Sequence, residues 1–376
     1  MSRVLVVTND FPTRRGGIES FVLALCERMP AAEVVVYTAS MPGDRVHDAR
    51  LPFPVYRDPS RTLLPTPAAT RRVVEVLRRH GCDRVLFGAS APLGLMAPAL
   101  RRAGARRIVA LTHGHEVWWA KAPVTRRLLR RIGDSVDVMT YVSEWCRERI
   151  APALSPRARA GMARVSPGVD TERFRPGCGG AEVRRRLGIV PDAPVVVCTA
   201  RLVRRKGQDA LIRAWPAVLD AHPGARLLLV GDGPDRRRLE RMAVRRGLGS
   251  SVIFTGGVSW HEVPAYTDAG NVFAMPCRTR LLGLEPEAWG IVFLEAQACG
   301  LPVIIGRSGG APETLLDPAG GEVLVGGQQE LSEAILRRLR AGTARRRPEA
   351  SLARWSWQQA AQRLSALWDQ QVDVPS

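Results

Sequence analysis

Residues 195–207 read VVVCTARLVRRKG, a short apolar run that passes into a basic turn ending in glycine. Continuous runs of β-branched residues are typical of strands buried on both faces of a parallel sheet. A helix-length segment follows the turn. Because strand, turn and helix in this order form the repeating unit of α/β folds, the stretch predicts that fold class.

Similar apolar runs recur on both sides of this stretch, separated by helix-length segments. Because strands that alternate with helices build βαβ units, the runs predict parallel sheets. They fall into two sets, which predicts two Rossmann-like α/β domains. The expected strands are residues 4–7, 34–37, 85–87, 108–111 and 138–142 in the first set, and residues 195–199, 227–230, 252–255, 272–275, 302–305 and 322–325 in the second.

A connector punctuated by proline and glycine, residues 166–177, separates the two sets. We therefore expect a first domain over residues 1–170 and a second over residues 171–354. Near the C-terminus, apolar residues recur at helical spacing, which predicts a helix over residues 355–372.

Composition excludes several classes of protein. The 376 residues are 45% hydrophobic and 24% charged, which is typical of a globular chain. Apolar stretches fall well short of the ~20 residues of a membrane helix, and the first residues lack the apolar region of a signal peptide. We therefore expect a cytosolic protein. The formal net charge of +19 predicts attraction to phosphates on nucleic acids, anionic lipids or nucleotide sugars.

Cysteine and histidine patterns give little support for a metal. The seven cysteines are scattered and form no C-x-x-C pair, so we expect neither a disulfide framework nor a zinc site. His113 and His115 follow the expected strand 108–111, where ligands bind in open α/β sheets. They could orient a substrate, accept a hydrogen bond or bind a metal. No distant ligand set accompanies them, and a structural bond to the backbone is the simplest interpretation of His115.

Two glycines, Gly16 and Gly17, stand between the first expected strand and a helix. Glycine there lets a phosphate or a sugar approach backbone N–H groups at the start of the helix. The spacing matches neither the dinucleotide fingerprint nor a P-loop. Taken alone, the pair is equally well explained as a turn.

Residues 287–302 read EAWGIVFLEAQACGLP, the richest segment for chemistry. A helix is expected from Ile291 to Gly300, because glycine and a following proline are stop signals. Gly290 would leave the helix start, with Ile291 and Val292, open to a pyrophosphate. Glu287 and Glu295 could then accept hydrogen bonds from hydroxyl groups at the two ends of one ligand. The alternative is that both carboxylates are simply exposed.

The basic turn of residues 201–207 adds a second element. Arg201 can clamp a phosphate with its planar guanidinium, and Lys206 can do so as a point charge. Lys206 is one of only two lysines in a chain with 55 basic residues, the other being Lys121. A solvated basic turn is the alternative, but the combination with Glu287 and Glu295 favours a binding site.

Together these segments resemble the retaining glycosyltransferases of family 4, which have the GT-B fold of two Rossmann-like domains facing across a cleft. The motifs that carry the resemblance are E-x7-E, from Glu287 to Glu295, and R-L-x-x-x-K-G, residues 201–207. Within the family, the resemblance is stronger to actinobacterial enzymes that transfer mannose from GDP-mannose to phosphatidylinositol monomannoside. It spans nearly the whole chain and is clearest at residues 6–12, 112–117, 130–134, 204–209, 273–280, 290–299 and 308–314.

The resemblance implies a role for each matching residue. Residues 1–170 would bind the acceptor, residues 171–354 would bind the nucleotide sugar, and the helix 355–372 would pack back on the first domain. The implied catalytic residues are His113, Arg201, Lys206 and Glu287. Arg201 and Lys206 would neutralise the diphosphate, Glu287 would hold sugar hydroxyls, Glu295 the ribose, and His113 would lie by the transferred sugar. Gly16, Gly17, Gly290, Ile291 and Val292 would complete the donor site, and Asn9, Asp10 and His115 the acceptor site.

The resemblance also implies an α-1,6 linkage, retention of anomeric configuration, and neither a cofactor nor a metal. Two residues, Ala288 and Trp289, depart from the pattern of the family, and they are expected to change the wall of the donor site near the transferred sugar. Residues 121–132 predict a basic amphipathic helix that docks on the inner, anionic face of the plasma membrane. A solvated helix with a core-facing stripe is the alternative.

Two other functions stay open from the sequence. One is a family member that uses another nucleotide sugar and a soluble metabolite or natural product. The other is a basic nucleic-acid-binding protein, for which no recognition motif is present.

Overall fold

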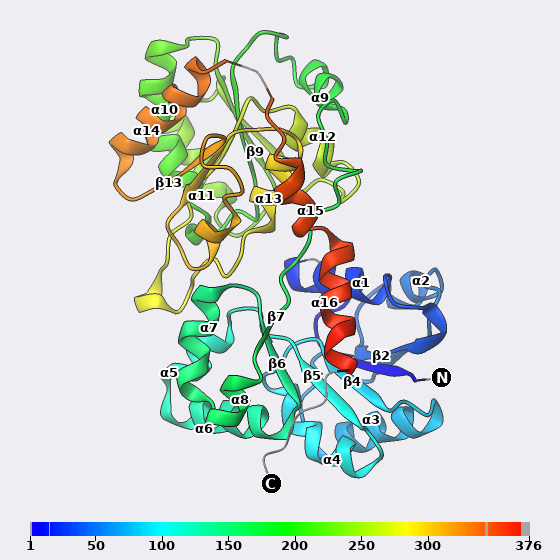
Figure 1. Cartoon of the computed structure of the whole chain (residues 1–376). Helices are drawn as coiled ribbons and strands as arrows, with labels where there is room; N and C mark the ends of the chain where they lie inside the picture. Colours follow the sequence, from blue (N-terminus) through cyan, green and yellow to red (C-terminus); the bar gives the residue numbers. More distant parts are fainter. Residues whose placement is uncertain (1, 15, 343–344, 370–376) are drawn as a thin grey trace. The chain divides into compact units, whose positions relative to one another are not determined.

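The computed structural model describes residues 2–14, 16–342 and 345–369. The chain forms two compact units, shown in Figure 1. Unit 1 comprises Met1–Pro167 and the C-terminal segment from Trp357, and unit 2 comprises Gly168–Ser356. The chain passes between units inside the expected connector, three residues before the predicted boundary.

Unit 1 is built on a seven-stranded parallel sheet with the order β3-β2-β1-β4-β5-β6-β7. β1 lies inside the sheet, where Val4 pairs with Val34 on one side and with Arg84 on the other. The strands are β1 Val4–Thr8, β2 Val34–Ala39, β3 Val55–Asp58, β4 Arg84–Phe87, β5 Arg107–Ala110, β6 Val138–Tyr141 and β7 Ala163–Arg164.

The two edge strands, β3 and β7, were missed by the sequence reasoning. Both lie at the sheet rim, and most of their residues are only half-buried. A strand with one open side can carry charged residues, so neither shows the continuous apolar run on which the prediction relied.

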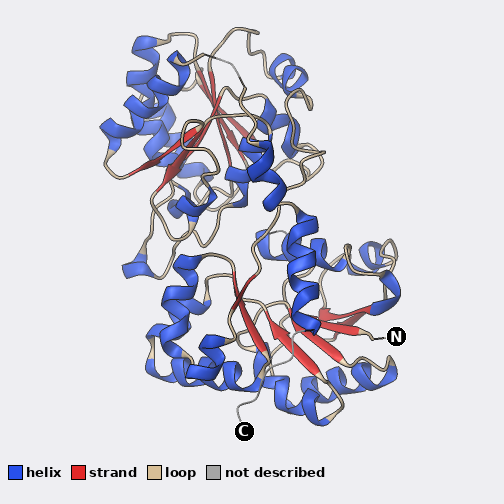
Figure 2. Cartoon of the chain, in the orientation of Figure 1, coloured by secondary structure: helices blue, strands red, loops and turns tan. Residues whose placement is uncertain are grey.

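Helices cover both faces of this sheet, as Figure 2 shows. They are α1 Gly17–Cys26, α2 Asp44–Asp48, α3 Pro67–Arg79, α4 Ala97–Arg102, α5 Glu116–Lys121, α6 Pro123–Ser135, α7 Glu144–Ile150, α8 Pro156–Ala160 and α16 Trp357–Asp369. The C-terminal helix α16 lies beside α1 in Figure 1, and the rings of Phe21 and Trp357 are 5.9 Å apart. Residues 370–372 of the expected helix lie outside the described residues.

The expected basic helix over residues 121–132 corresponds to α6, which begins two residues later than predicted. α5 ends at Lys121, Ala122 is extended with φ −84° and ψ 137°, and Pro123 opens α6. A residue before proline avoids helical geometry, whereas proline fits the first position of a helix. The prediction is therefore confirmed over residues 123–132, and only its first two residues were placed wrongly, although the X-Pro signal was present in the sequence.

Unit 2 contains a six-stranded parallel sheet with the order β10-β9-β8-β11-β12-β13. All six expected strands are present, and each strand end lies within one residue of its predicted position. They are β8 Val195–Thr199, β9 Arg226–Val230, β10 Val252–Gly256, β11 Val272–Met275, β12 Val303–Gly306 and β13 Gly321–Leu324. β8 lies between β9 and β11, so the stretch of residues 195–207 begins with an inner strand of this sheet.

The helices of unit 2 are α9 Gly180–Arg186, α10 Gln208–Ala221, α11 Arg236–Arg245, α12 Val263–Asp268, α13 Ile291–Ala298, α14 Gln328–Arg340 and α15 Glu349–Arg354. Among the described residues, the structure shows no helix with the length and apolar character needed to cross a bilayer.

Candidate active site

Lys206 and Glu287 form an ion pair at the carboxyl edge of the unit 2 sheet. The Lys206 Nζ donates a hydrogen bond to Glu287 Oε2 over 2.6 Å, and the two side chains are only 12% and 11% exposed. Lys206 ends the turn after β8, and Gly207 follows with φ +80° against the carbonyl of Pro276. A side chain at residue 207 would collide with that carbonyl, so glycine lets the turn pack against the loop after β11.

Backbone hydrogen bonds fix the position of Glu287. Its N–H donates to Ser308 Oγ over 3.1 Å, and its carbonyl accepts from the Gly310 N–H over 2.9 Å. Ser308 Oγ also lies 2.9 Å from Thr279 Oγ1. The segment Ser308–Gly310 is therefore the support for Glu287, a role that the sequence reasoning missed.

Arg205 is a second cation at this site that the sequence reasoning missed. Its Nε lies 3.9 Å from Glu287 Oε2 and is buried without a hydrogen-bond partner within the described chain. A cavity of about 360 Å³ lies beside it, with Arg204, Arg280 and Glu285 in the lining. The adjacent basic residues of this turn are the sequence signal from which a second cation could have been predicted.

Arg201 is placed differently from Lys206. Its side chain is exposed and makes no ion pair with any residue that the structure describes, while its carbonyl accepts a hydrogen bond from Gln208 over 3.2 Å. The structure therefore brings Lys206 and Arg205 together on Glu287, and leaves the guanidinium of Arg201 in solvent.

The start of α13 carries no side-chain cap. Gly290 precedes the helix with φ +90° and ψ 59°, and a Cβ there would lie 2.8 Å from Phe293 Cδ2. The N–H groups of Ile291 and Val292 have no acceptor within the helix, because the first turn of a helix lacks preceding carbonyls. Both residues are half-buried. This end of α13 can bind an anion through its free N–H groups and the helix dipole.

Glu295 lies inside α13 and is only 3% exposed. Burial raises the pKa of this carboxyl to about 8, against a smaller opposing effect of the Arg173 charge. It makes no ion pair among the described residues, unlike Glu287. The two carboxylates of the E-x7-E motif thus occupy different environments, one paired with a cation and the other enclosed.

Trp289 does not line an open wall. It is only 4% exposed, and its ring lies 4.8 Å from that of Trp355 at an angle of 49°. The tryptophan that departs from the family pattern is therefore part of the packing between the start of α13 and the end of α15.

His113 makes two hydrogen bonds in unit 1, one through its ring and one through its backbone. Its Nε2 lies 2.5 Å from the carbonyl of Gly88, and its backbone N–H donates to Glu116 Oε2 over 3.0 Å. Burial lowers the pKa of His113, which favours the neutral ring. Because a carbonyl only accepts, the Nε2 carries the proton and the Nδ1 is left as an acceptor.

Glu116 holds this turn, and the sequence reasoning did not assign it. It is fully buried and accepts a hydrogen bond from Ser90 Oγ over 2.9 Å. His115 Nε2 lies 3.3 Å from the same carboxylate and 3.4 Å from the carbonyl of Ala91. His115 thus has the backbone contact that the simplest interpretation of the sequence predicted.

The remaining residues proposed for the acceptor lie after β1. The side-chain amide of Asn9 bonds to both backbone groups of Leu63, over 2.8 Å and 2.6 Å, so it clamps that loop. Asp10 Oδ1 lies 3.8 Å from Arg14 Nη1. Gly16 and Gly17 are exposed at the start of α1, where Gly17 has open space around its missing side chain.

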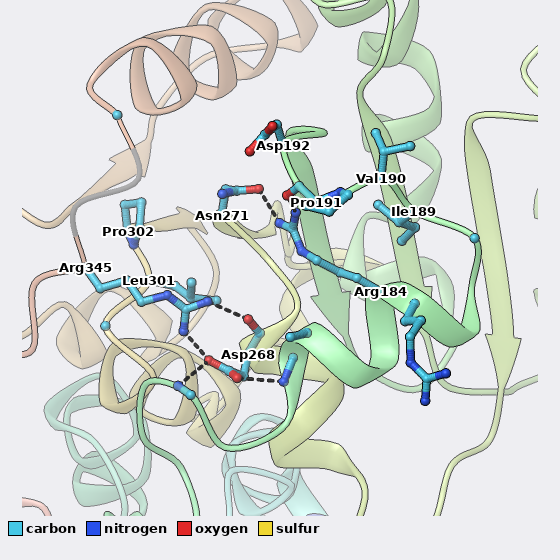
Figure 3. A pocket seen from close by; sticks show the side chains of 17 residues that line it. Arg184, Ile189, Val190, Pro191, Asp192, Asp268, Asn271, Leu301, Pro302 and Arg345 are labelled. Carbon is cyan, nitrogen blue, oxygen red and sulfur yellow. Dashed lines mark hydrogen bonds and ion pairs between the residues drawn. The ribbon is translucent and has the colours of Figure 1, made fainter.

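A cavity of about 1010 Å³ lies elsewhere in unit 2 (Figure 3). Asn271 and Pro302 in its lining directly precede β11 and β12, so it opens at the amino edge of the sheet, opposite Lys206. Its polar groups bind one another: Arg184 donates to Asn271 Oδ1 over 2.6 Å, and Arg345 pairs with Asp268. This cavity therefore offers few free partners to a polar ligand.

No group of three or more histidine, cysteine, aspartate or glutamate side chains suited to a metal ion occurs in residues 2–14, 16–342 and 345–369.

Two family models match the chain in succession. The model described as Glycosyltransferase Family 4 matches residues 15–173, and the model described as Glycosyl transferases group 1 matches residues 181–352. The first therefore covers most of unit 1 and the second most of unit 2.

Curated relatives match over nearly the full length. The GDP-mannose-dependent alpha-(1-6)-phosphatidylinositol monomannoside mannosyltransferase of Mycolicibacterium smegmatis is 45% identical, with 97% of each chain covered. The GDP-mannose-dependent monoacylated alpha-(1-6)-phosphatidylinositol monomannoside mannosyltransferase of Corynebacterium glutamicum is 41% identical, with 96% of this chain and 97% of the relative covered. Among solved structures, Anabaena HepE in complex with UDP has a TM-score of 0.81 at 20% identity, with 97% and 99% of the two chains covered.

Proposed function

This chain belongs to the family 4 glycosyltransferases, which have the GT-B fold, and on that premise we propose that it transfers mannose from GDP-mannose to phosphatidylinositol monomannoside. The linkage formed would be α-1,6, the linkage that the names of the two actinobacterial relatives contain. The observation that carries the proposal is the Lys206–Glu287 pair beside the open start of α13.

The donor would bind in unit 2. Departure of GDP develops negative charge on its phosphate, and fixed cations and helix N–H groups stabilise that charge most in the transition state. Lys206, Arg205 and the start of α13 would supply them. Glu287 would accept hydrogen bonds from mannose hydroxyls, and Glu295 from the ribose. Arg201, which is exposed in this structure, would join the diphosphate through a change of its side-chain conformation.

The reaction would retain the anomeric configuration without a covalent intermediate on the protein. Glu287 is held by Lys206 at 2.6 Å, which suits a binding role better than that of a nucleophile. The acceptor hydroxyl would attack C1 on the face from which GDP departs. The C1–O bond to the phosphate breaks as the new glycosidic bond forms, and a donor phosphate oxygen takes the hydroxyl proton. The cations named above would replace a metal.

The acceptor would bind in unit 1. His113 is neutral with its Nδ1 available, so it can accept a hydrogen bond from a sugar hydroxyl. We also propose that Asp10 and His115 contact the acceptor. Gly16 and Gly17, at the start of α1, would contact the donor phosphate. The amide of Asn9 is already bonded to Leu63, so its contribution would be to hold the loop.

The enzyme would reach its lipid substrate by docking on the inner face of the plasma membrane. Arg126, Arg127, Arg130 and Arg131 on α6 are exposed. Trp118 and Val124 are exposed beside them, by 39% and 68%. Because Leu129 and Ile132 are buried in unit 1, the contact would rest on the cations and these two apolar side chains.

Product analysis tests the function directly. The purified chain is supplied with GDP-mannose or UDP-sugars, and with phosphatidylinositol monomannoside in vesicles or with water-soluble acceptors. We expect a dimannosylated lipid with an α-1,6 linkage, identified by mass spectrometry and NMR. Transfer only to soluble acceptors, or only from another nucleotide sugar, would support the alternative family member instead.

A further inference from the structure

Arg278, in the loop after β11, holds the turn that carries Lys206 at two points. Its backbone N–H donates to the carbonyl of Arg205 over 2.8 Å, directly before Lys206 in the chain. Its guanidinium reaches Asp209, three residues after Lys206, and Nη2 lies 2.8 Å and 2.9 Å from the two carboxylate oxygens. Lys206 therefore lies between two contacts that one residue of a distant loop makes with its turn.

Asp209 is a firm anchor for this guanidinium. It lies in the first turn of α10 and is only 5% exposed. Arg213, one turn further along the helix, also donates to Asp209 Oδ2, over 3.0 Å. Burial alone would raise the pKa of Asp209, but the hydrogen bonds and charges of Arg278 and Arg213 outweigh burial and hold the pKa below its ordinary value. Hydrogen bonds between such charged groups are stronger than those between neutral groups.

The next residue of the same loop supports the other member of the ion pair. Thr279 Oγ1 lies 2.9 Å from Ser308 Oγ, and that oxygen accepts the hydrogen bond from the Glu287 N–H. Arg278 and Thr279 are adjacent in the chain. One short segment after β11 is therefore linked both to the lysine turn and to the support of Glu287.

The contact between Lys206 and Glu287 joins two loops, so its geometry depends on how firmly those loops are held to each other. We propose that Arg278 and Asp209 are positioning residues for transfer, and that their ion pair fixes the ammonium of Lys206 against Glu287. Neither side chain needs to touch the donor in this role. The effect on turnover rests on the proposed function, whereas the position of the ammonium can be measured without a substrate.

Acetylation of lysine supplies that measurement, because Lys206 and Lys121 are the only lysines of the chain. The Lys206 side chain is paired and 12% exposed, whereas Lys121 is exposed at the end of α5. The full chain is treated briefly with an amine-acetylating reagent, and peptide mass spectrometry gives the acetylation of Lys206 relative to Lys121. Arg278→Ala should raise this ratio at least about threefold, because the ammonium would leave the carboxylate more often. An unchanged ratio would overturn the proposal.

Steady-state kinetics with GDP-mannose measure the effect on transfer. For Arg278→Ala we expect kcat to fall about 10-fold or more with a smaller change in KM, because a misplaced cation costs most where charge develops in the transition state. Asp209→Asn should have the same effect, and the double variant should be no slower than either single variant, since both remove one contact. Arg278→Lys keeps the charge without the planar guanidinium, so it should recover part of the loss. Additive losses in the double variant would contradict a shared role.

Arg213→Ala is the matched control. It removes an arginine from the same carboxylate but leaves the bridge from Asp209 to Arg278, so the acetylation ratio and kcat should stay near those of the unchanged protein. Equal losses in the Arg213→Ala and Arg278→Ala variants would overturn the proposal, because they would show that Asp209 needs only a compensating charge. If the unchanged chain transfers no mannose, the proposed function fails, and the acetylation ratio still decides whether Arg278 positions Lys206.

Discussion

Lys206 Nζ and Glu287 Oε2 are 2.6 Å apart, although 81 positions separate the two residues in the chain. Lys206 follows β8, and Glu287 lies in the loop between β11 and α13. Because β8 and β11 are parallel neighbours, their carboxyl ends meet at one edge of the sheet. A lysine and a glutamate from two distant motifs therefore become one polar unit, in which the cation compensates the buried carboxylate.

Replacing the lysine should disable transfer. Lys206→Ala removes the cation that would stabilise the departing diphosphate and leaves Glu287 without its closest partner, so we expect kcat to fall at least about 100-fold. Initial rates with GDP-mannose measure this, and circular dichroism reports whether the fold is kept. Arg245→Ala, at an exposed arginine of α11, should retain full activity as the matched control. Near-normal turnover of the Lys206→Ala variant would refute the site.

Ser308 should act through Glu287 rather than on the substrate. Ser308→Ala removes the acceptor for the Glu287 N–H, so the carboxylate would be less well fixed, and we expect KM for GDP-mannose to rise about 10-fold with a smaller change in kcat. Steady-state kinetics separate the two constants. Ser259→Ala, at an exposed serine of the same unit, serves as the control. An unchanged KM would mean that Ser308 does not position the carboxylate.

Much of this arrangement was predictable from the sequence, because buried parallel strands and helix stops leave strong local patterns. All six strands of unit 2 and the helix start at Ile291 were expected. Ser308 and Glu116 were missed, because Ser308 accepts from the backbone N–H of Glu287 and Glu116 from the His113 N–H and the Ser90 hydroxyl, and such bonds leave no periodicity. Arg205 was passed over in favour of Arg201, since the family motif marks only residues 201, 202, 206 and 207.

Glu295 should make stability depend on pH. Its folded pKa is about 8 against an ordinary value of 4.5, so between these values the folded chain binds more protons than the unfolded chain. The free energy of unfolding that this group contributes therefore falls as pH rises through that window. Glu295→Gln cannot lose a proton, so its Tm relative to the unchanged protein should rise from about pH 5 to about pH 8. Parallel Tm profiles would contradict the raised pKa.

Chelation should leave transfer intact. In the proposed reaction Lys206, Arg205 and the start of α13 stabilise the departing GDP, so no metal is needed for that charge. Activity measured after extensive dialysis against EDTA should equal that of the untreated enzyme, and added Mg²⁺ should not raise it. Loss of activity that Mg²⁺ or Mn²⁺ restores would overturn the metal-independent mechanism while leaving the donor and acceptor assignments to be judged separately.

The arginines of α6 should govern binding to anionic vesicles. Reversal of Arg126, Arg127, Arg130 and Arg131 to glutamate changes cations that would each contribute about 1 kcal/mol at the membrane surface. We therefore expect the partition coefficient on vesicles rich in anionic lipid to fall at least about 100-fold. Vesicle co-sedimentation at low and high salt measures this, and the unchanged protein should lose binding as salt rises.

A control of equal charge separates a docking helix from general attraction by a protein of net charge +19. Arg237, Arg241, Arg245 and Arg246, on and just after α11, are also exposed. Reversing these four changes the net charge by the same amount in unit 2. If docking is local to α6, this second variant keeps most of its vesicle binding, because surface attraction decays within a Debye length. Equal losses in the two variants would show that overall charge, rather than α6, draws the protein to the membrane.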